Sequence, residues 1–170
     1  MSEDFPDNPD LADELLIVRH SGEIPEVALH GSLWHLTGSP DGPGRELVEV
    51  EVLALKGMVV ERYREMILRD LEPANRNKSF YRGVARAAVN WHRLEKFCRR
   101  EGLELELLRA EIGAALVALL CLELAEVAAG RPVPALNCFG EELWRFAVAV
   151  EVNPATLPTG WEHLCQPNPD

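Results

Sequence analysis

A row of basic side chains is the strongest candidate for a chemical role in this sequence. Six lysines and arginines recur at helical spacing and would share one helix face within an arc of roughly 80°: Lys78, Arg82, Arg86, Arg93, Lys96 and Arg100. At a rise of ~1.5 Å per residue the row is about 33 Å long. It could follow the phosphates of a polyanion, releasing counterions, or face acidic groups of a partner or of its own fold.

The segment that ends at His20 is the nearest approach to a catalytic motif. It reads Leu15-Leu-Ile-Val-Arg-His20, continues as Ser21-Gly-Glu23, and resembles the Arg-His-Gly-Glu motif at a strand end of the histidine phosphatases. The resemblance implies a histidine nucleophile beside an arginine that neutralises phosphate. It covers about nine residues, Ser21 interrupts it, and helices are predicted where that family needs further strands. We therefore interpret the segment as a short apolar element followed by a polar turn.

Histidine and cysteine do not form a metal-binding pattern. His30 and His35 are five residues apart, whereas one helix face requires a spacing of three or four. Cys98 and Cys121 lie among apolar residues, as small core residues do, and no CxxC pair occurs. We predict no metal, no cofactor and four reduced thiols, as expected in the cytoplasm.

Carboxylates are numerous, so pairs at helical spacing arise by chance. No Glu-x-x-His occurs, which argues against a di-iron site in a helical core. Glu111, Glu123 and Glu126 are interpreted as solvated positions or salt-bridge partners. Because no nucleophile–base pair or phosphate-binding loop is found either, the sequence leans away from an enzyme.

Apolar periodicity predicts several helices around these candidates. Glu46–Glu72 carries two apolar stripes and is read as one long helix, although alternation over Val48–Val52 leaves open a strand in residues 46–56. Further helices are predicted at residues 78–100 and 103–129 and after Asn137. The centres of their apolar faces form the predicted core: Trp91, Leu94, Leu116, Leu119, Leu120 and Phe146.

The predicted fold is all-α: an antiparallel bundle of four to five helices with an irregular N-terminal segment. Residues 1–44, rich in proline and glycine, would pack on the bundle of residues 45–170. Within the third helix, Ile112–Leu122 has no polar face and needs burial in the bundle or in a subunit interface. This need predicts a homodimer.

The charge distribution limits the choice of partners. The 170-residue chain has a net charge of −11, yet residues 73–100 contain 8 basic and 1 acidic side chains. Overall negative charge argues against anionic membranes and weakens the case for nucleic acid. We therefore predict a non-enzymatic cytoplasmic protein that acts by self-association or protein–protein interaction. The alternative is a nucleic-acid-associated or regulatory protein that uses the basic face of residues 78–100.

Overall fold

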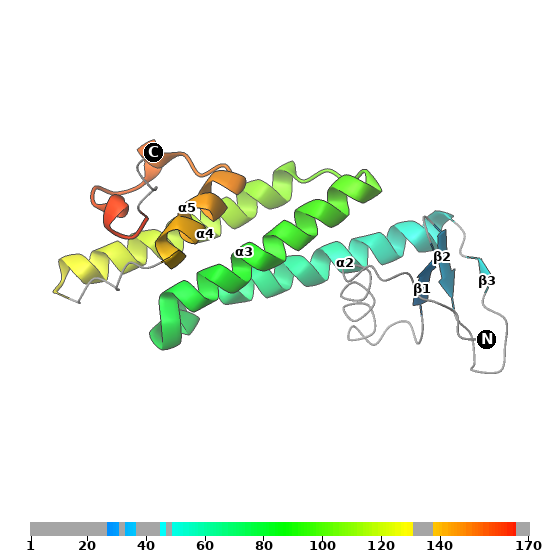
Figure 1. The fold of residues 1–170 in the computed structure, drawn as a ribbon, viewed down its shortest axis with the longest axis horizontal. Helices are drawn as coiled ribbons and strands as arrows, with labels where there is room; N and C mark the ends of the chain where they lie inside the picture. The colour runs from blue at the N-terminus through cyan, green and yellow to red at the C-terminus, as the bar shows by residue number, and fades with distance from the viewer. Residues whose placement is uncertain (1–26, 31–32, 37–44, 47–48, 131–137, 166–170) are drawn as a thin grey trace. The chain divides into compact units, whose positions relative to one another are not determined.

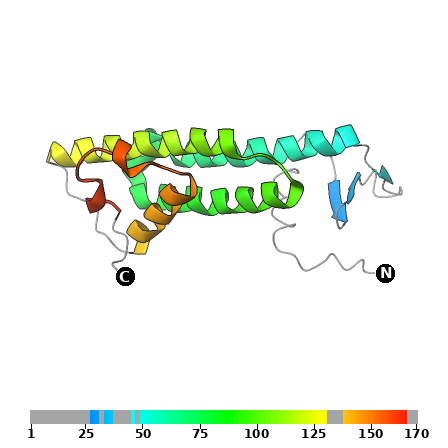
Figure 2. The same ribbon diagram turned by 90° about the horizontal axis from the view of Figure 1, so that it is seen from above.

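The computed structural model describes residues 27–30, 33–36, 45–46, 49–130 and 138–165. The chain divides into two compact units, residues 1–62 and residues 63–170, and the boundary falls inside helix α2 (Glu49–Asp70). Each unit is described by itself. Figures 1 and 2 show the elements in two perpendicular views.

The first unit contains a small antiparallel sheet. β1 (Val27–His30) pairs with β2 (Leu33–Leu36) in a register that places Val27 opposite Leu36. β2 also pairs with β3 (Arg45–Glu46), so the strand order is β1-β2-β3. β1 and β2 lie within residues 1–44, the segment predicted to be irregular, and β3 follows directly after it.

Helix α2 resolves the question of helix or strand in residues 46–56. From Glu49 onward the chain is helical, so the prediction of a long helix is confirmed there, while Glu46 belongs to β3. The buried residues of α2 are Val59, Tyr63 and Ile67, which combine members of both predicted apolar stripes, and Leu71 is buried just beyond the end of the helix. The helix ends before the short 3-10 helix η1 (Pro73–Asn75), because proline cannot continue an α-helix.

Helices α3 (Arg76–Glu101) and α4 (Glu106–Ala128) run in opposite directions beside one another in both views (Figures 1 and 2). Gly102 supplies the left-handed residue of the connection, with φ of 67°, a conformation that suits glycine at a helix C-terminus. The apolar face predicted for α3 is buried along its length: Phe80, Val84, Ala87, Trp91, Leu94 and Cys98.

The C-terminal elements cover α3 and α4. α5 (Cys138–Ala149) packs against α3 and is followed by the 3-10 helices η2 (Pro154–Thr156) and η3 (Trp161–His163). A Cβ at Gly113 of α4 would lie 2.9 Å from the carbonyl oxygen of Val150, so this glycine permits a close approach of the chain that leaves α5. The Tyr81 hydroxyl donates a hydrogen bond to the Leu164 carbonyl, with an oxygen–oxygen distance of 3.2 Å.

Residues 49–130 and 138–165 are entirely helical apart from turns, which confirms the all-α class for this part of the chain. All six predicted core residues are buried there, none more than 3% exposed. None of the described helices has the length and apolarity that a membrane span requires. The antiparallel bundle of four to five helices and the division into residues 1–44 and 45–170 stay predictions.

Candidate functional site

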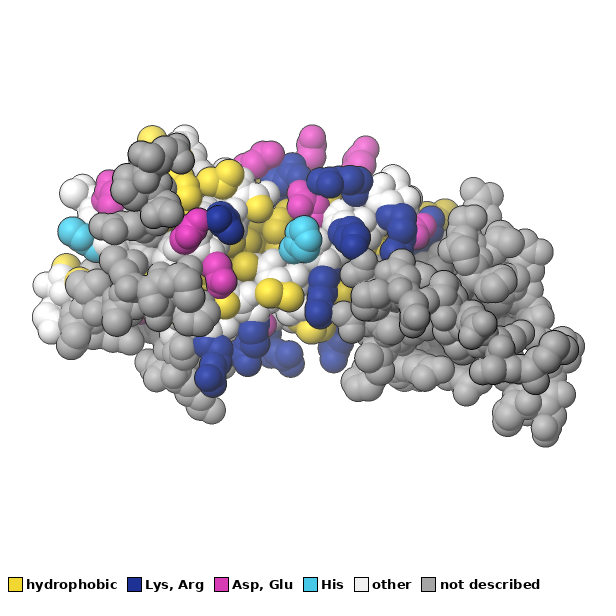
Figure 3. Space-filling model, viewed as in Figure 1, with side chains coloured by type: hydrophobic (Ala, Val, Ile, Leu, Met, Phe, Trp, Pro, Cys, Tyr) yellow, Lys and Arg dark blue, Asp and Glu magenta, His cyan; other side chains and the backbone are white. Residues whose placement is uncertain are grey.

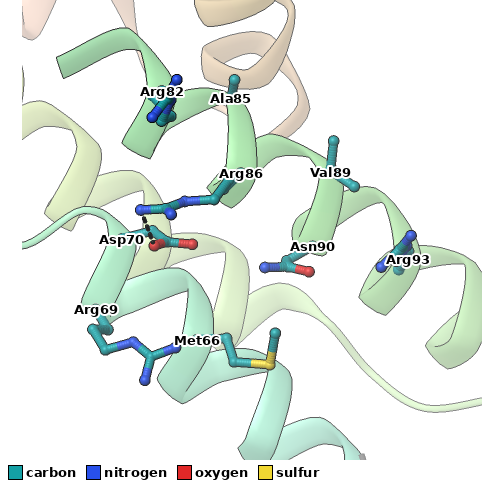
Figure 4. A pocket seen from close by; sticks show the side chains of 9 residues that line it. All are labelled: Met66, Arg69, Asp70, Arg82, Ala85, Arg86, Val89, Asn90 and Arg93. Atoms are coloured by element: carbon teal, nitrogen blue, oxygen red, sulfur yellow. Dashed lines mark ion pairs between the residues drawn. The ribbon is translucent and has the colours of Figure 1, made fainter. Parts of the chain in front are cut away.

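A groove between the C-terminal end of α2 and the middle of α3 gathers arginines around an apolar patch. Its volume is about 580 Å³, and the described residues that line it all belong to the second unit. α2 contributes Met66, Arg69 and Asp70, and α3 contributes Arg82, Ala85, Arg86, Val89, Asn90 and Arg93 (Figure 4). Lys and Arg side chains and exposed apolar atoms lie side by side over α3 in Figure 3. The groove therefore combines positive charge with the apolar side chains of Met66, Ala85 and Val89.

Gly83 explains why α2 and α3 approach closely at one end of this groove. A Cβ on Gly83 would lie 2.8 Å from the backbone carbonyl oxygen of Asp70, a distance that real Cβ contacts do not reach. The absence of a side chain therefore lets α3 press against the last turn of α2. One turn further along α3, Arg86 pairs with the Asp70 carboxylate at 3.1 Å.

The Asp70 carboxylate is the one acidic group among the residues that line the groove. Burial raises the pKa of Asp70, and the nearby Arg86 and Arg69 partly oppose this rise. Burial raises this pKa more than the two cations lower it, so the folded protein disfavours the ionised form of Asp70 relative to water. Arg86 remains 61% exposed and retains donors for a ligand, since a guanidinium carries five N–H groups.

Asn90 is the buried polar residue of the groove. It is 7% exposed, and no side-chain hydrogen bond of its amide is found among the described residues. Figure 4 shows Asn90 and Arg86 extending from α3 toward α2. An amide offers two donors and an acceptor, so Asn90 can bind a polar group that enters between the helices.

The structure brings together part of the predicted basic row. Arg82, Arg86 and Arg93 line the groove, whereas Lys96 and Arg100 lie beyond its lining. The Lys78 side chain lies outside the described side chains. Sequence reasoning missed Arg69 and Met66, since a helical wheel of one segment carries no information about its neighbour. Val89, 52% exposed, was detectable as the apolar residue in the middle of the basic arc.

The outward face of α4 is a second candidate surface. Between Leu107 and Ala125 its exposed residues follow one another at spacings of three and four along the helix, and they are all apolar: Leu107, Ala110, Ala114, Ala118, Leu122 and Ala125. We call these residues the α4 outer stripe. Leu107 is 90% exposed and Leu122 is 42% exposed. Water therefore contacts a row of apolar side chains, which is flanked by the exposed Glu106 and by Glu111.

Glu111 lies at the edge of the α4 outer stripe and is held by an arginine. The Arg64 Nε and Nη2 atoms donate to the two Glu111 carboxylate oxygens at 2.7 and 2.5 Å. This hydrogen bonding lowers the pKa of Glu111, with the charge of Arg64 adding to the effect and burial opposing it. The salt-bridge interpretation of Glu111 is thereby confirmed.

The opposite face of α4 contains a buried carboxylate. Glu123 is completely buried, so its interpretation as a solvated position is wrong.

Burial, together with Cys165 and Glu123, raises the pKa of Tyr81 to about 12. Burial also raises the pKa of the Cys98 thiol to about 11 and that of Cys165 to about 12. These thiols stay protonated at neutral pH and are poor nucleophiles.

The remaining chemical candidates do not converge on a described site. Arg19 and His20 lie outside the described residues, as do the side chains of His30 and His35. Cys98, Cys121 and Cys165 are free thiols. Within residues 49–130 and 138–165, no three His, Cys, Asp or Glu side chains are grouped as a metal ion would require.

A comparison with protein families matches residues 8–152 to a model described as "Repeat of unknown function (DUF7826)". No curated protein and no solved structure is significantly similar to the chain.

Proposed function

The chain belongs to the family described as a repeat of unknown function (DUF7826), and we propose that it acts by self-association through the α4 outer stripe. The observation that carries this proposal is the stripe itself: exposed, apolar residues from Leu107 to Ala125. An apolar helix face left in water favours association, because burying it removes apolar surface from the solvent. The partner proposed is a second copy of the chain in a cytoplasmic homodimer.

The composition of the stripe favours another copy of itself as the occupant. Three alanines lie between the two leucines and a fourth follows Leu122, and small side chains let helix axes approach to about 8 Å. A twofold axis through the middle of α4 would place Leu107 of one copy near Ala125 of the other, so that large residues meet small ones. Arg64 neutralises Glu111, the carboxylate that lies beside the middle of the stripe.

The proposed assembly keeps the helical bundle intact. The inward face of α4 is already covered, with Ile112, Leu116 and Leu120 completely buried. Only the outward face remains for a partner, at a length of about 27 Å for 18 helical rises. Together with the antiparallel bundle predicted from sequence, this surface supports the proposal that the chain acts by association.

Light scattering after size-exclusion chromatography tests the proposal. Wild-type protein at micromolar concentration should have twice the chain mass of 19.0 kDa. Leu107→Glu should give the monomer mass, because two buried carboxylates would face the apolar stripe of the opposite copy. Its own fold should survive, since Leu107 is 90% exposed.

Val148→Glu provides the matched control. Val148 is 55% exposed on α5, outside the stripe, so this variant should keep the wild-type mass. A wild-type protein that elutes as a monomer at every concentration, or a Leu107→Glu variant that stays dimeric, would refute self-association through α4.

A further inference from the structure

The groove between α2 and α3 is independent of the α4 outer stripe, and its chemistry defines a ligand. Four guanidinium groups and one carboxylate line it, so its formal charge is positive although the chain as a whole is acidic. We propose that this groove binds an acidic peptide segment of another protein, in which carboxylates alternate with apolar side chains. This inference goes beyond the proposed self-association.

The spacing of the arginines requires an extended ligand. Arg82 and Arg93 are eleven residues apart on α3, which corresponds to about 16 Å along the helix. A single carboxylate or phosphate is too small to reach both. About five residues of extended peptide cover this distance, and a carboxylate on such a peptide is attracted to guanidinium groups.

The apolar side chains of the groove distinguish a peptide from a nucleic acid. Met66, Ala85 and Val89 line the groove between the arginines, and Val89 is half exposed. Apolar side chains of a peptide would cover these residues. Single-stranded nucleic acid binds by stacking its bases on aromatic side chains, and none of the described residues that line the groove is aromatic.

Asn90 supplies the specific contact that such a ligand would use. Asn90 is 7% exposed, and its side chain extends toward α2 (Figure 4). A peptide main chain offers both an N–H and a carbonyl group, which match the acceptor and the donors of an amide. Asp70 opposes an acidic ligand, but Arg86 already neutralises it at 3.1 Å.

Fluorescence anisotropy with a labelled probe tests the assignment. The probe is a synthetic peptide of about ten residues in which glutamate and leucine alternate. It should bind the full-length protein, and the same peptide with glutamine in place of glutamate should bind about tenfold more weakly or worse, because it cannot form charge-assisted hydrogen bonds. An oligothymidylate of similar length should bind more weakly than the acidic peptide.

Two matched variants locate the binding. Val89→Glu places a carboxylate among the residues of α3 that line the groove and should weaken peptide binding by about tenfold or more through like-charge repulsion. Val148→Glu makes the same substitution at a similarly exposed helical position outside the groove, 55% against 52% exposed, and should leave the affinity within about twofold. Circular dichroism of both variants checks that they remain folded.

Three results would overturn the proposal: no binding of the acidic peptide at millimolar concentration, equal losses in Val89→Glu and Val148→Glu, or tighter binding of the oligothymidylate. The last result would favour the nucleic-acid alternative. Leu107→Glu separates the two sites, since it should lose the dimer and retain peptide binding. Peptide binding that disappears with the dimer would show that the groove does not act by itself.

Discussion

The pair formed by Arg64 and Glu111 is the residue-scale interaction with the clearest dependence on pH. Its two hydrogen bonds lower the pKa of Glu111, so its stabilising effect is present above the unfolded-state pKa of about 4.3. That effect is lost as the pH falls through the lower pKa of the folded state. The two side chains are 31% and 40% exposed, and solvent screening limits the pair to less than about 1 kcal/mol.

Glu111→Gln should therefore lower the free energy of unfolding by up to about 1 kcal/mol at neutral pH and by less at about pH 3. Urea denaturation of both proteins at the two pH values measures the difference. Arg145→Gln is the control, because its exposed pair with Glu141 joins adjacent turns of one helix and should contribute less. An equal loss at both pH values would contradict an ionic origin.

At the scale of elements, Gly83 determines how closely α3 approaches the end of α2. Gly83→Ala would place its new methyl group 2.8 Å from the Asp70 carbonyl, and a backbone atom cannot move away as a flexible side chain can. We expect this overpacking to destabilise the protein by about 1–3 kcal/mol, even though alanine has the higher helix propensity. Urea denaturation of the variant measures this loss.

Gly57 in α2 is the matched control for this substitution. A Cβ there would have no neighbouring atom within 4 Å, so Gly57→Ala should stabilise the protein by up to about 1 kcal/mol through helix propensity alone. Two substitutions of the same type should thus act in opposite directions. Equal effects at the two positions would show that Gly83 is not a packing residue.

At the scale of the whole molecule, the net charge of −11 should affect the two proposed sites in opposite ways. Two acidic copies repel each other, so raising the salt from about 0.02 to about 0.5 M should screen this repulsion and tighten the dimer. Binding of the acidic peptide depends on attraction to arginines and should weaken over the same range. Sedimentation equilibrium and anisotropy titrations at each salt concentration measure the two effects. A dimer that dissociates as salt rises would indicate an ionic interface instead of the apolar stripe.

The helices and the buried face of α3 were predictable from the sequence because polar and apolar residues alternate there with helical period. Phe80, Trp91 and Leu94 stand opposite Arg82 and Arg93 on the same turns, so one side of the helix is marked for burial. Pro73 and Gly102 mark the helix ends for equally local reasons, a missing donor and a left-handed backbone. Such patterns depend on neighbours within a few residues.

The orientation of α4 and the composition of the groove required the tertiary structure. α4 is apolar on nearly every side, so its sequence contains no contrast that predicts Leu122 outside and Glu123 inside. Packing against α3 and the C-terminal turns determines that choice. Likewise, the sequence shows one row of arginines on α3: Arg82, Arg86 and Arg93. Arg69 and Met66 join this row from α2, where Gly83 lets the two helices approach closely. Periodicity reports the faces of one helix, whereas contacts between distant segments depend on shape and volume that no single segment contains.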